Sequence, residues 1–176
     1  MLPVVVLDTS VVVKWFRQEE VLAAEALAWR QAYVDGETTV VVPMLLVYEV
    51  ANALQYKGDL TAKQVEEAIE GLFDLDLEWV RPSVVLMQRV VRLARAHKLT
   101  VYDATFVALA EMLHTPLITA DDKLVRRVAS DLVVHFAATI APMPPPTWPG
   151  RGHRNPPRLT GEDSTVEIRY WRDTRR

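Results

Sequence analysis

The 176-residue sequence predicts an α/β domain with three layers, in which one central parallel sheet lies between two layers of helices. Two observations lead to this fold class. Short runs of β-branched residues alternate along the chain with longer segments of helical periodicity, an order typical of a parallel sheet covered on both faces. The first run, Val4–Leu7, is apolar at every position, as expected for a strand buried on both sides.

Five short apolar segments are the expected strands. Pro43 stops the second segment and Pro82 follows the third, which fits strand ends because proline is a strong breaker of regular structure. In chain order the strands are residues 4–7, 39–42, 77–80, 117–119 and 132–136.

Six longer segments have apolar residues at helical spacing. Thr61 and Gln64 form a capping-box pattern at the start of one of them. The segment 84–97 is strongly amphipathic, with arginines alternating with apolar residues. The expected helices are residues 22–34, 44–56, 61–73, 84–97, 102–113 and 123–128.

The composition narrows the class of protein. No cysteine occurs, so disulfides, thiolate zinc sites and cysteine nucleophiles are excluded, and the chain suits a reducing compartment. The first residues lack a basic leader and their apolar run ends at Asp8, so we expect no signal peptide. No stretch approaches the roughly 18–20 apolar residues that span a bilayer. We therefore expect a soluble, cytoplasmic protein that does not bind membranes.

The character of the sequence changes at Pro142. Seven of the eleven prolines lie between positions 142 and 157, a composition typical of an extended linker. We expect a domain over residues 1–141 and a flexible Pro/Arg-rich tail over 142–176. Residues 165–171 alternate enough to form a strand, but only against an available sheet edge.

The charge is distributed unevenly between these two parts. The tail carries seven arginines against four acidic residues, so the first 141 residues hold a net charge of −6 within the total of −3. A nucleic-acid binder usually shows a basic excess, and this domain does not. A nucleic-acid substrate would therefore require a local source of positive charge, for which a divalent metal ion is the obvious candidate.

Four acidic residues stand where a carboxylate is hard to explain by folding alone. Asp8 and Asp121 follow expected strands, whereas Glu49 and Asp103 lie within apolar helices. Ligand sites of open α/β sheets form outside the carboxyl ends of the strands. We expect the four side chains to reach one crevice at that edge of the sheet.

Each acid also has a structural alternative. Asp8 and Asp121 could cap the helices that follow them, and Asp103 forms a capping-box pattern with Thr100. Glu49 differs, because no cation lies three or four positions away on its helix. A buried carboxylate without a partner is costly, so Glu49 needs a partner from elsewhere in the chain.

Carboxylates gathered without a cation repel one another and respond with raised pKa values and bound protons. Two of them about 4 Å apart repel by roughly 4 kcal/mol at an effective dielectric near 20. Mg²⁺ or Mn²⁺ relieves this repulsion, prefers oxygen ligands and keeps several waters. Such an ion activates bound water and neutralises charge on a phosphodiester. The residue set therefore favours phosphodiester hydrolysis.

The four acidic segments together resemble the motifs of PIN-domain nucleases, and in style and length the VapC toxins of bacterial toxin–antitoxin pairs. The resemblance covers residues 4 to about 136, with the segments in the family order. The segments read VVLDTS, YEVANA, YDATFVA and LITAD.

The resemblance implies a metal-dependent endoribonuclease. It implies that Asp8, Glu49, Asp103 and Asp121 hold one or two Mg²⁺ or Mn²⁺ ions. It also implies a parallel sheet between helices, an RNA substrate, a homodimer and a cognate protein antitoxin that restrains the enzyme.

Neighbouring polar residues have two interpretations each. Ser10 and Thr119 match the family's polar positions that support the metal centre, but helix capping and a strand-end hydroxyl explain them equally well. Asp122 directly follows Asp121, so either could face the metal; we favour Asp121.

Several cations are candidates for contact with RNA. Lys14, Arg17 and Lys57 lie near the motif residues in sequence, which makes them better candidates for contact with phosphates than the basic face of residues 89–98. The basic face of residues 89–98 is typical of a solvated helix surface. The arginine-rich tail could hold RNA or be free of it.

Two rival functions were weighed. An aspartate-nucleophile phosphatase needs a second aspartate two residues after Asp8, and Ser10 stands there. A catalytically silent PIN-like module that binds RNA or protein is the remaining alternative, against which the presence of all four acids argues.

Overall fold

The computed structural model describes residues 3–17, 19–56 and 58–136. The tail over 142–176, its possible strand at 165–171, and Lys57 lie outside the described residues. The domain limits at 1–141 and 142–176 therefore stay a prediction.

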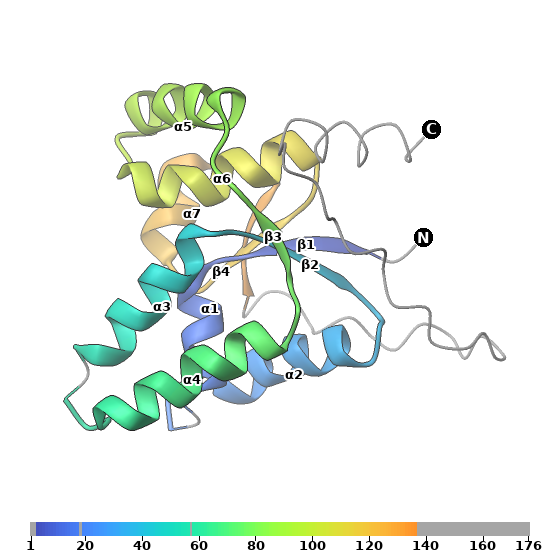
Figure 1. Cartoon of the computed structure of the whole chain (residues 1–176). Coiled ribbons are helices and arrows are strands. Elements are labelled where there is room, and N and C mark those ends of the chain that lie inside the picture. Colours follow the sequence, from blue (N-terminus) through green and yellow to red (C-terminus); the bar gives the residue numbers. More distant parts are fainter. Residues whose placement is uncertain (1–2, 18, 57, 137–176) are drawn as a thin grey trace, which may run out of the picture.

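The structure contains a five-stranded sheet in which all neighbouring strands are parallel (Figure 1). The spatial order of the strands is β3-β2-β1-β4-β5. The strands are β1 (Val4–Leu7), β2 (Thr39–Pro43), β3 (Glu78–Val80), β4 (Leu117–Thr119) and β5 (Val133–His135).

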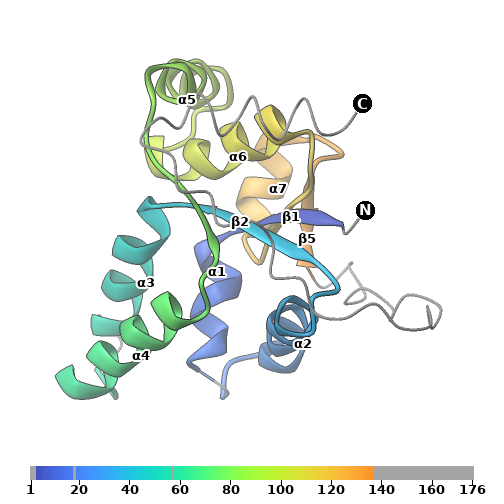
Figure 2. The same ribbon diagram turned by 45° about the vertical axis from the view of Figure 1, so that its right-hand side comes forward.

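Helices cover both faces of this sheet, which confirms the three-layer fold class. Figures 1 and 2 show the first four helices on one face and the last three on the other. The helices are α1 (Thr9–Val12), α2 (Ala23–Val34), α3 (Leu45–Gln55), α4 (Ala62–Asp74), α5 (Val84–His97), α6 (Val101–Leu113) and α7 (Asp122–Val128), with a 3₁₀ turn η1 at Val13–Trp15.

Every strand and helix expected from the sequence is present, with ends that differ by at most one or two residues. The sequence pattern did not predict α1 and η1 as separate elements. Together they span only Thr9 to Trp15, too few residues to show a helical period, and they include a run of valines that favours strand. Asp8 nevertheless caps α1, as one interpretation of this residue anticipated.

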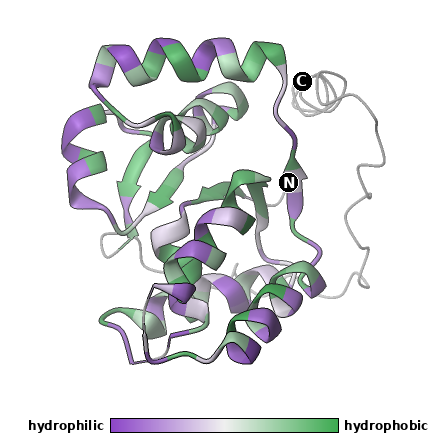
Figure 3. Cartoon of the chain, turned by 60° about the vertical axis from the view of Figure 1, so that its left-hand side comes forward, coloured by the Kyte–Doolittle hydropathy of each residue, from purple (hydrophilic) through white to green (hydrophobic). Residues whose placement is uncertain are grey.

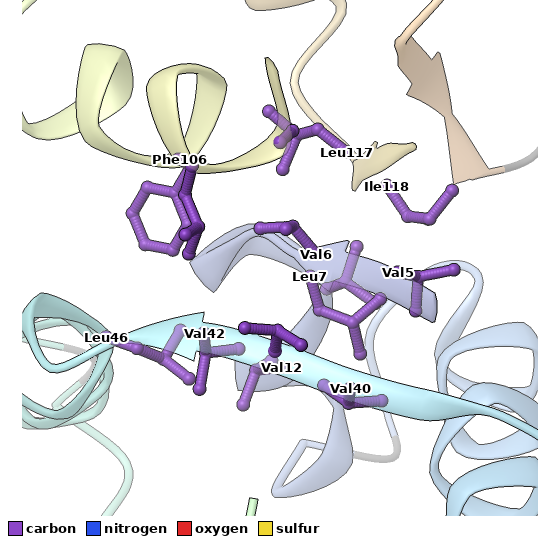
Figure 4. Close-up of a cluster of buried hydrophobic side chains, with 14 of the residues drawn as sticks. Val5, Val6, Leu7, Val12, Val40, Val42, Leu46, Phe106, Leu117 and Ile118 are labelled. Carbon is purple, nitrogen blue, oxygen red and sulfur yellow. The ribbon is translucent and has the colours of Figure 1, made fainter. Parts of the chain in front are cut away.

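The hydrophobic core lies on both sides of the sheet. Strand β2 is buried along its whole length, which explains its lack of polar alternation. Helix α6 is buried from Ala104 to Ala110 because it lies between the sheet and α5. Figure 4 shows side chains of β1, β2 and β4 packed with Val12 of α1, Leu46 of α3 and Phe106 of α6.

Helix α5 forms the outermost layer, and its surface reflects this position. Figure 3 shows hydrophilic and hydrophobic bands alternating along this helix at the top of the molecule. Its buried residues Leu86, Val90 and Leu93 recur at helical spacing toward α6. None of the helices among residues 3–17, 19–56 and 58–136 has the length and apolar character needed to cross a membrane.

The strand order places a topological switch point between β1 and β4. From β1 the chain moves outward through β2 to β3, and it then returns to the other side of β1 to form β4 and β5. The two connections leave opposite faces of the sheet, so a crevice opens at the carboxyl ends of these two strands. Asp8 and Thr119 stand at this edge.

Candidate active site

Asp8 is a buried carboxylate held by hydroxyl groups. It follows β1, its backbone N–H donates to the carbonyl of Ile118 at 2.9 Å, and only 8% of the residue is exposed. The hydroxyls of Ser10 and Thr119 donate to Oδ2 of Asp8 at 2.5 and 2.8 Å. The backbone N–H of Ser10 donates to the same oxygen at 3.4 Å, so three donors meet on one side of the carboxylate.

These hydroxyls also tie the ends of β1 and β4 together. The N–H of Ala120 donates to the Ser10 hydroxyl at 2.9 Å, and the N–H of Asp121 donates to the Thr119 hydroxyl at 3.0 Å. Ser10 and Thr119 lie 3.3 Å apart through their hydroxyl oxygens. The two polar residues singled out in the sequence therefore form one network around Asp8.

Glu49 finds its partner on a different element. The hydroxyl of Thr9, in the first turn of α1, donates to Oε2 of Glu49 at 2.5 Å. Glu49 lies on α3, 40 residues away in sequence, and is half-buried. Sequence reasoning showed that Glu49 lacked a local partner but did not identify Thr9. The position of Thr9 directly after Asp8 is the only signal that could have indicated it.

Asp103 lies in the first turn of α6, where Thr100 caps the helix. The Thr100 hydroxyl accepts the backbone N–H of Asp103 at 3.0 Å, as the capping pattern predicted. This bond uses the backbone of Asp103 and leaves its carboxylate for other contacts. Asp103 is half-buried.

The carboxylates of Asp8, Glu49 and Asp103 influence one another. Burial raises the pKa of Asp8, the hydroxyls of Ser10 and Thr119 oppose this shift, and the charge of Asp103 adds to it. Burial also raises the pKa of Glu49, with further increases from Asp8 and Asp103. The fold therefore brings three of the four predicted acids close enough for their charges to interact.

Asp121 is used as a helix cap. Its Oδ1 accepts the backbone N–H groups of Lys123 and Leu124 at 2.7 and 3.3 Å, which satisfies the first turn of α7. Asp122 points elsewhere: its side chain is 71% exposed and lies 3.7 Å from the imidazole Nε2 of His135. The role of Asp121 at a metal stays a prediction.

The chemistry of this donor set fits a hard divalent cation. The carboxylates of Asp8, Glu49 and Asp103 offer oxygen ligands. Burial, with a smaller contribution from neighbouring negative charge, raises the pKa values of Asp8 and Glu49, and a bound cation would oppose this shift. Within the described part of the chain, no three acidic or imidazole side chains are gathered closely enough to ligate one ion together. Mg²⁺ does not require three protein ligands, since it usually keeps several waters and binds one or two carboxylates.

The nearby cations are engaged by acidic residues of the protein. Lys14 forms an ion pair with Glu20 at 3.0 Å. Arg17 is 8% exposed and its guanidinium donates to both carboxylate oxygens of Asp59 at 2.8 Å, with Glu19 at 2.7 Å. A phosphate would have to compete with these carboxylates, so contact of Lys14 or Arg17 with RNA stays a prediction.

The fold and the site together define a doubly wound α/β domain with an acidic crevice at its switch point. A sequence model of the PIN domain family matches residues 5–130, and the chain belongs to this family. PIN domains are typically metal-dependent nucleases that use divalent ions.

One solved structure supports the same fold. The crystal structure of PAE2754 from Pyrobaculum aerophilum resembles this chain with a TM-score of 0.54 and 19% identity, over 72% of this chain and 79% of that one. None of the curated proteins compared with the chain matches it.

Proposed function

We propose that this PIN domain is a Mg²⁺- or Mn²⁺-dependent endoribonuclease that hydrolyses RNA phosphodiester bonds. The observation that supports this most strongly is the buried Asp8 at the switch point. Its pKa is raised by burial and by the charge of Asp103, and Asp8 and Asp103 in turn raise the pKa of Glu49. A folded protein that places repelling carboxylates in a crevice has an arrangement suited to binding a cation there.

The side chains have distinct roles in this proposal. Three hydrogen bonds meet on Oδ2 of Asp8, so Oδ1 is the oxygen that we assign to the ion. Glu49, oriented by Thr9, and Asp103 contribute the remaining negative charge, with Asp121 as a further ligand. When bound, the ion activates a water molecule and neutralises charge that develops on the phosphodiester.

We further propose that the protein is the toxin of a type II toxin–antitoxin pair, of the VapC type. In this setting it acts in the cytoplasm as a homodimer and is restrained by a cognate protein antitoxin. The support is the ordered set of motifs that resembles those toxins. Apolar side chains at the surface of α5 also suit a protein–protein contact, since Val84 and Val85 are 74% and 51% exposed.

The test compares the wild type with Asp103→Asn, which removes one negative charge from the crevice. We expect the wild type to arrest growth and to cleave total RNA in the presence of Mg²⁺, and Asp103→Asn to do neither. Asp122→Asn is the matched control, because it removes the same charge from a solvent-exposed position, and it should retain both effects.

Two outcomes would contradict the nuclease assignment. Equal cleavage by the wild type and Asp103→Asn would mean that the crevice does not catalyse the reaction. No cleavage by any of the three folded proteins would favour the catalytically silent module, whose function is to bind RNA or protein.

A further inference from the structure

A group of exposed cations lies on α5 and α7, two helices that are distant in sequence. Lys123, Arg126 and Arg127 are exposed on α7, and their spacing of three and four residues places them on one face of that helix. Arg95 in the last turn of α5 and Lys98 at its C-cap are also exposed. We call these five residues the basic seam.

Direct contacts join the two halves of the seam. The guanidinium of Arg127 donates to the backbone carbonyl of Lys98 at 3.3 Å. The imidazole Nδ1 of His97 lies 3.2 Å from the backbone carbonyl of Arg127. The end of α5 and the end of α7 are therefore held side by side, and their cations form one surface.

The seam adjoins the chain segments that carry two of the predicted acids. Lys98 precedes Thr100, the residue that caps α6 and bonds the backbone of Asp103. Lys123 donates its backbone N–H to the carboxylate of Asp121. Both acids therefore lie within a few residues of the seam in the sequence.

The cations of the seam differ in their partners from three other cations of the domain. Lys14, Arg17 and Arg89 each form an ion pair with a carboxylate. Within the described ranges, no ion pair engages a residue of the seam. This surface therefore presents unneutralised positive charge, although the first 141 residues carry a net charge of −6.

An exposed aromatic residue lies in the chain between Lys98 of the seam and Asp103. Tyr102 follows the cap of α6, directly precedes Asp103, and is 59% exposed. Exposed aromatic rings beside a basic groove are the usual platform on which single-stranded bases stack. An acidic peptide would use the cations but would gain less from the ring, so the combination favours RNA.

We infer that the basic seam binds the phosphate backbone of single-stranded RNA, with a base stacked on Tyr102, and leads the strand into the acidic crevice. This inference rests on the proposed function, because it assigns the path of the substrate of that site. It also explains how an acidic domain can hold a polyanion, since the positive charge is concentrated along one edge of the crevice.

The test measures RNA binding without catalysis. A fluorescently labelled single-stranded RNA is titrated by anisotropy in EDTA, at several salt concentrations, with the wild type and the double variant Arg95→Gln/Arg126→Gln. Arg127 is left intact because it joins the two helices. The control is Arg30→Gln/Lys63→Gln, which removes two exposed charges from α2 and α4.

We expect the seam variant to bind RNA about tenfold more weakly at low salt. The slope of log K against log salt should fall by about 1.4, since each lost phosphate contact on a single strand contributes roughly 0.7. Tyr102→Ala should also weaken binding, by about tenfold. The control should match the wild type, and circular dichroism should show all variants folded.

The possible outcomes separate the seam from the proposed function. If the wild type does not bind RNA, or if the seam variant binds RNA as tightly as the wild type, the proposed role of the seam is wrong. This holds whether or not the wild type cleaves RNA. Weaker binding by the seam variant supports the seam even if cleavage is never observed. Unlabelled RNA and oligoglutamate of equal length are also compared as competitors of the labelled RNA. If both displace it equally well, the assignment of RNA is wrong and an acidic protein partner is favoured.

Discussion

The hydrogen bonds around Asp8 hold its carboxylate in one orientation. Its Oδ2 accepts three hydrogen bonds from Ser10 and Thr119, which fix the orientation of the side chain. Such bonds from surrounding residues orient metal ligands and tune their affinity. Thr9 acts in the same way on Glu49 from the next position along the chain.

We predict that Thr9→Val lowers the rate of RNA cleavage by about 10- to 100-fold, the usual effect of losing a group that orients a metal ligand. Valine keeps the shape of threonine but cannot donate to Glu49. Thr9→Ser retains the hydroxyl and should restore most of the activity. The check is the rate of cleavage as a function of Mg²⁺ concentration, in which Thr9→Val should need more metal. Equal rates for the two variants would show that the hydroxyl is not required.

The pKa of Asp8 predicts a dependence of stability on pH. Burial and Asp103 raise this pKa above its ordinary value of 3.8, so folding favours the protonated form. The stabilisation is complete below the unfolded pKa and is lost as the pH rises toward the folded one. In metal-free solution Asp8→Asn, which stays neutral, should therefore gain stability relative to the wild type as the pH rises above about 4.

Urea denaturation in EDTA at several pH values measures this difference. Mg²⁺ should reverse it by stabilising only the wild type, by about 2.7 kcal/mol at 100 times the dissociation constant. A difference between the two proteins that does not grow with pH would contradict the electrostatic account of Asp8.

At the scale of elements, helix caps position the acids of the crevice. Thr100 begins α6 and so fixes the backbone of Asp103, whereas Asp121 is itself the cap of α7. A capping residue and a metal ligand can use the same carboxylate. A substitution that preserves the cap but weakens metal ligation therefore separates the two roles of Asp121.

Asp121→Asn makes this separation, because asparagine caps helices about as well as aspartate. We predict that the free energy of unfolding changes by no more than about 0.5 kcal/mol, since the cap is preserved. If Asp121 is also a metal ligand, cleavage should fall by about tenfold or more. Asp122→Asn is the matched control and should leave both quantities unchanged. Full activity of Asp121→Asn would restrict Asp121 to capping.

The elements themselves could largely be predicted from the sequence. Buried strands such as β2 and the capped helix α4 carry strong local signals, so their ends were placed within one or two residues. The short helix α1 could not, because a few residues show no period. The bond between Thr9 and Glu49 could not either, since it joins positions 40 residues apart that only the fold brings together.

At the scale of the whole molecule, the strand order determines where the site lies. Because β1 and β4 are neighbours at the switch point, the residues that follow them meet although they are more than 100 residues apart. All described strands and all members of the described hydrophobic cluster lie at or before Phe136. The described residues therefore include the sheet, a hydrophobic core and the side chains that form the crevice.

We predict that a chain ending at Ala141 folds and cleaves RNA as the full chain does. The described core lies at or before Phe136, and residues 142–176 carry seven prolines and a surplus of positive charge, a composition typical of a linker. Thermal unfolding and the rate of RNA cleavage of both chains provide the check. A melting temperature lowered by several degrees, or a loss of cleavage, would place the domain boundary beyond residue 141.

The central claim is that the acidic crevice around Asp8, Glu49 and Asp103 binds a divalent cation. A crystal of the protein grown with Mn²⁺ tests it directly, because anomalous scattering locates manganese without ambiguity. We predict an anomalous peak within coordination distance of Oδ1 of Asp8, about 2.0–2.3 Å, on the side of Glu49 and Asp103. A crystal with no peak in this crevice, at a Mn²⁺ concentration that supports RNA cleavage, would contradict the account.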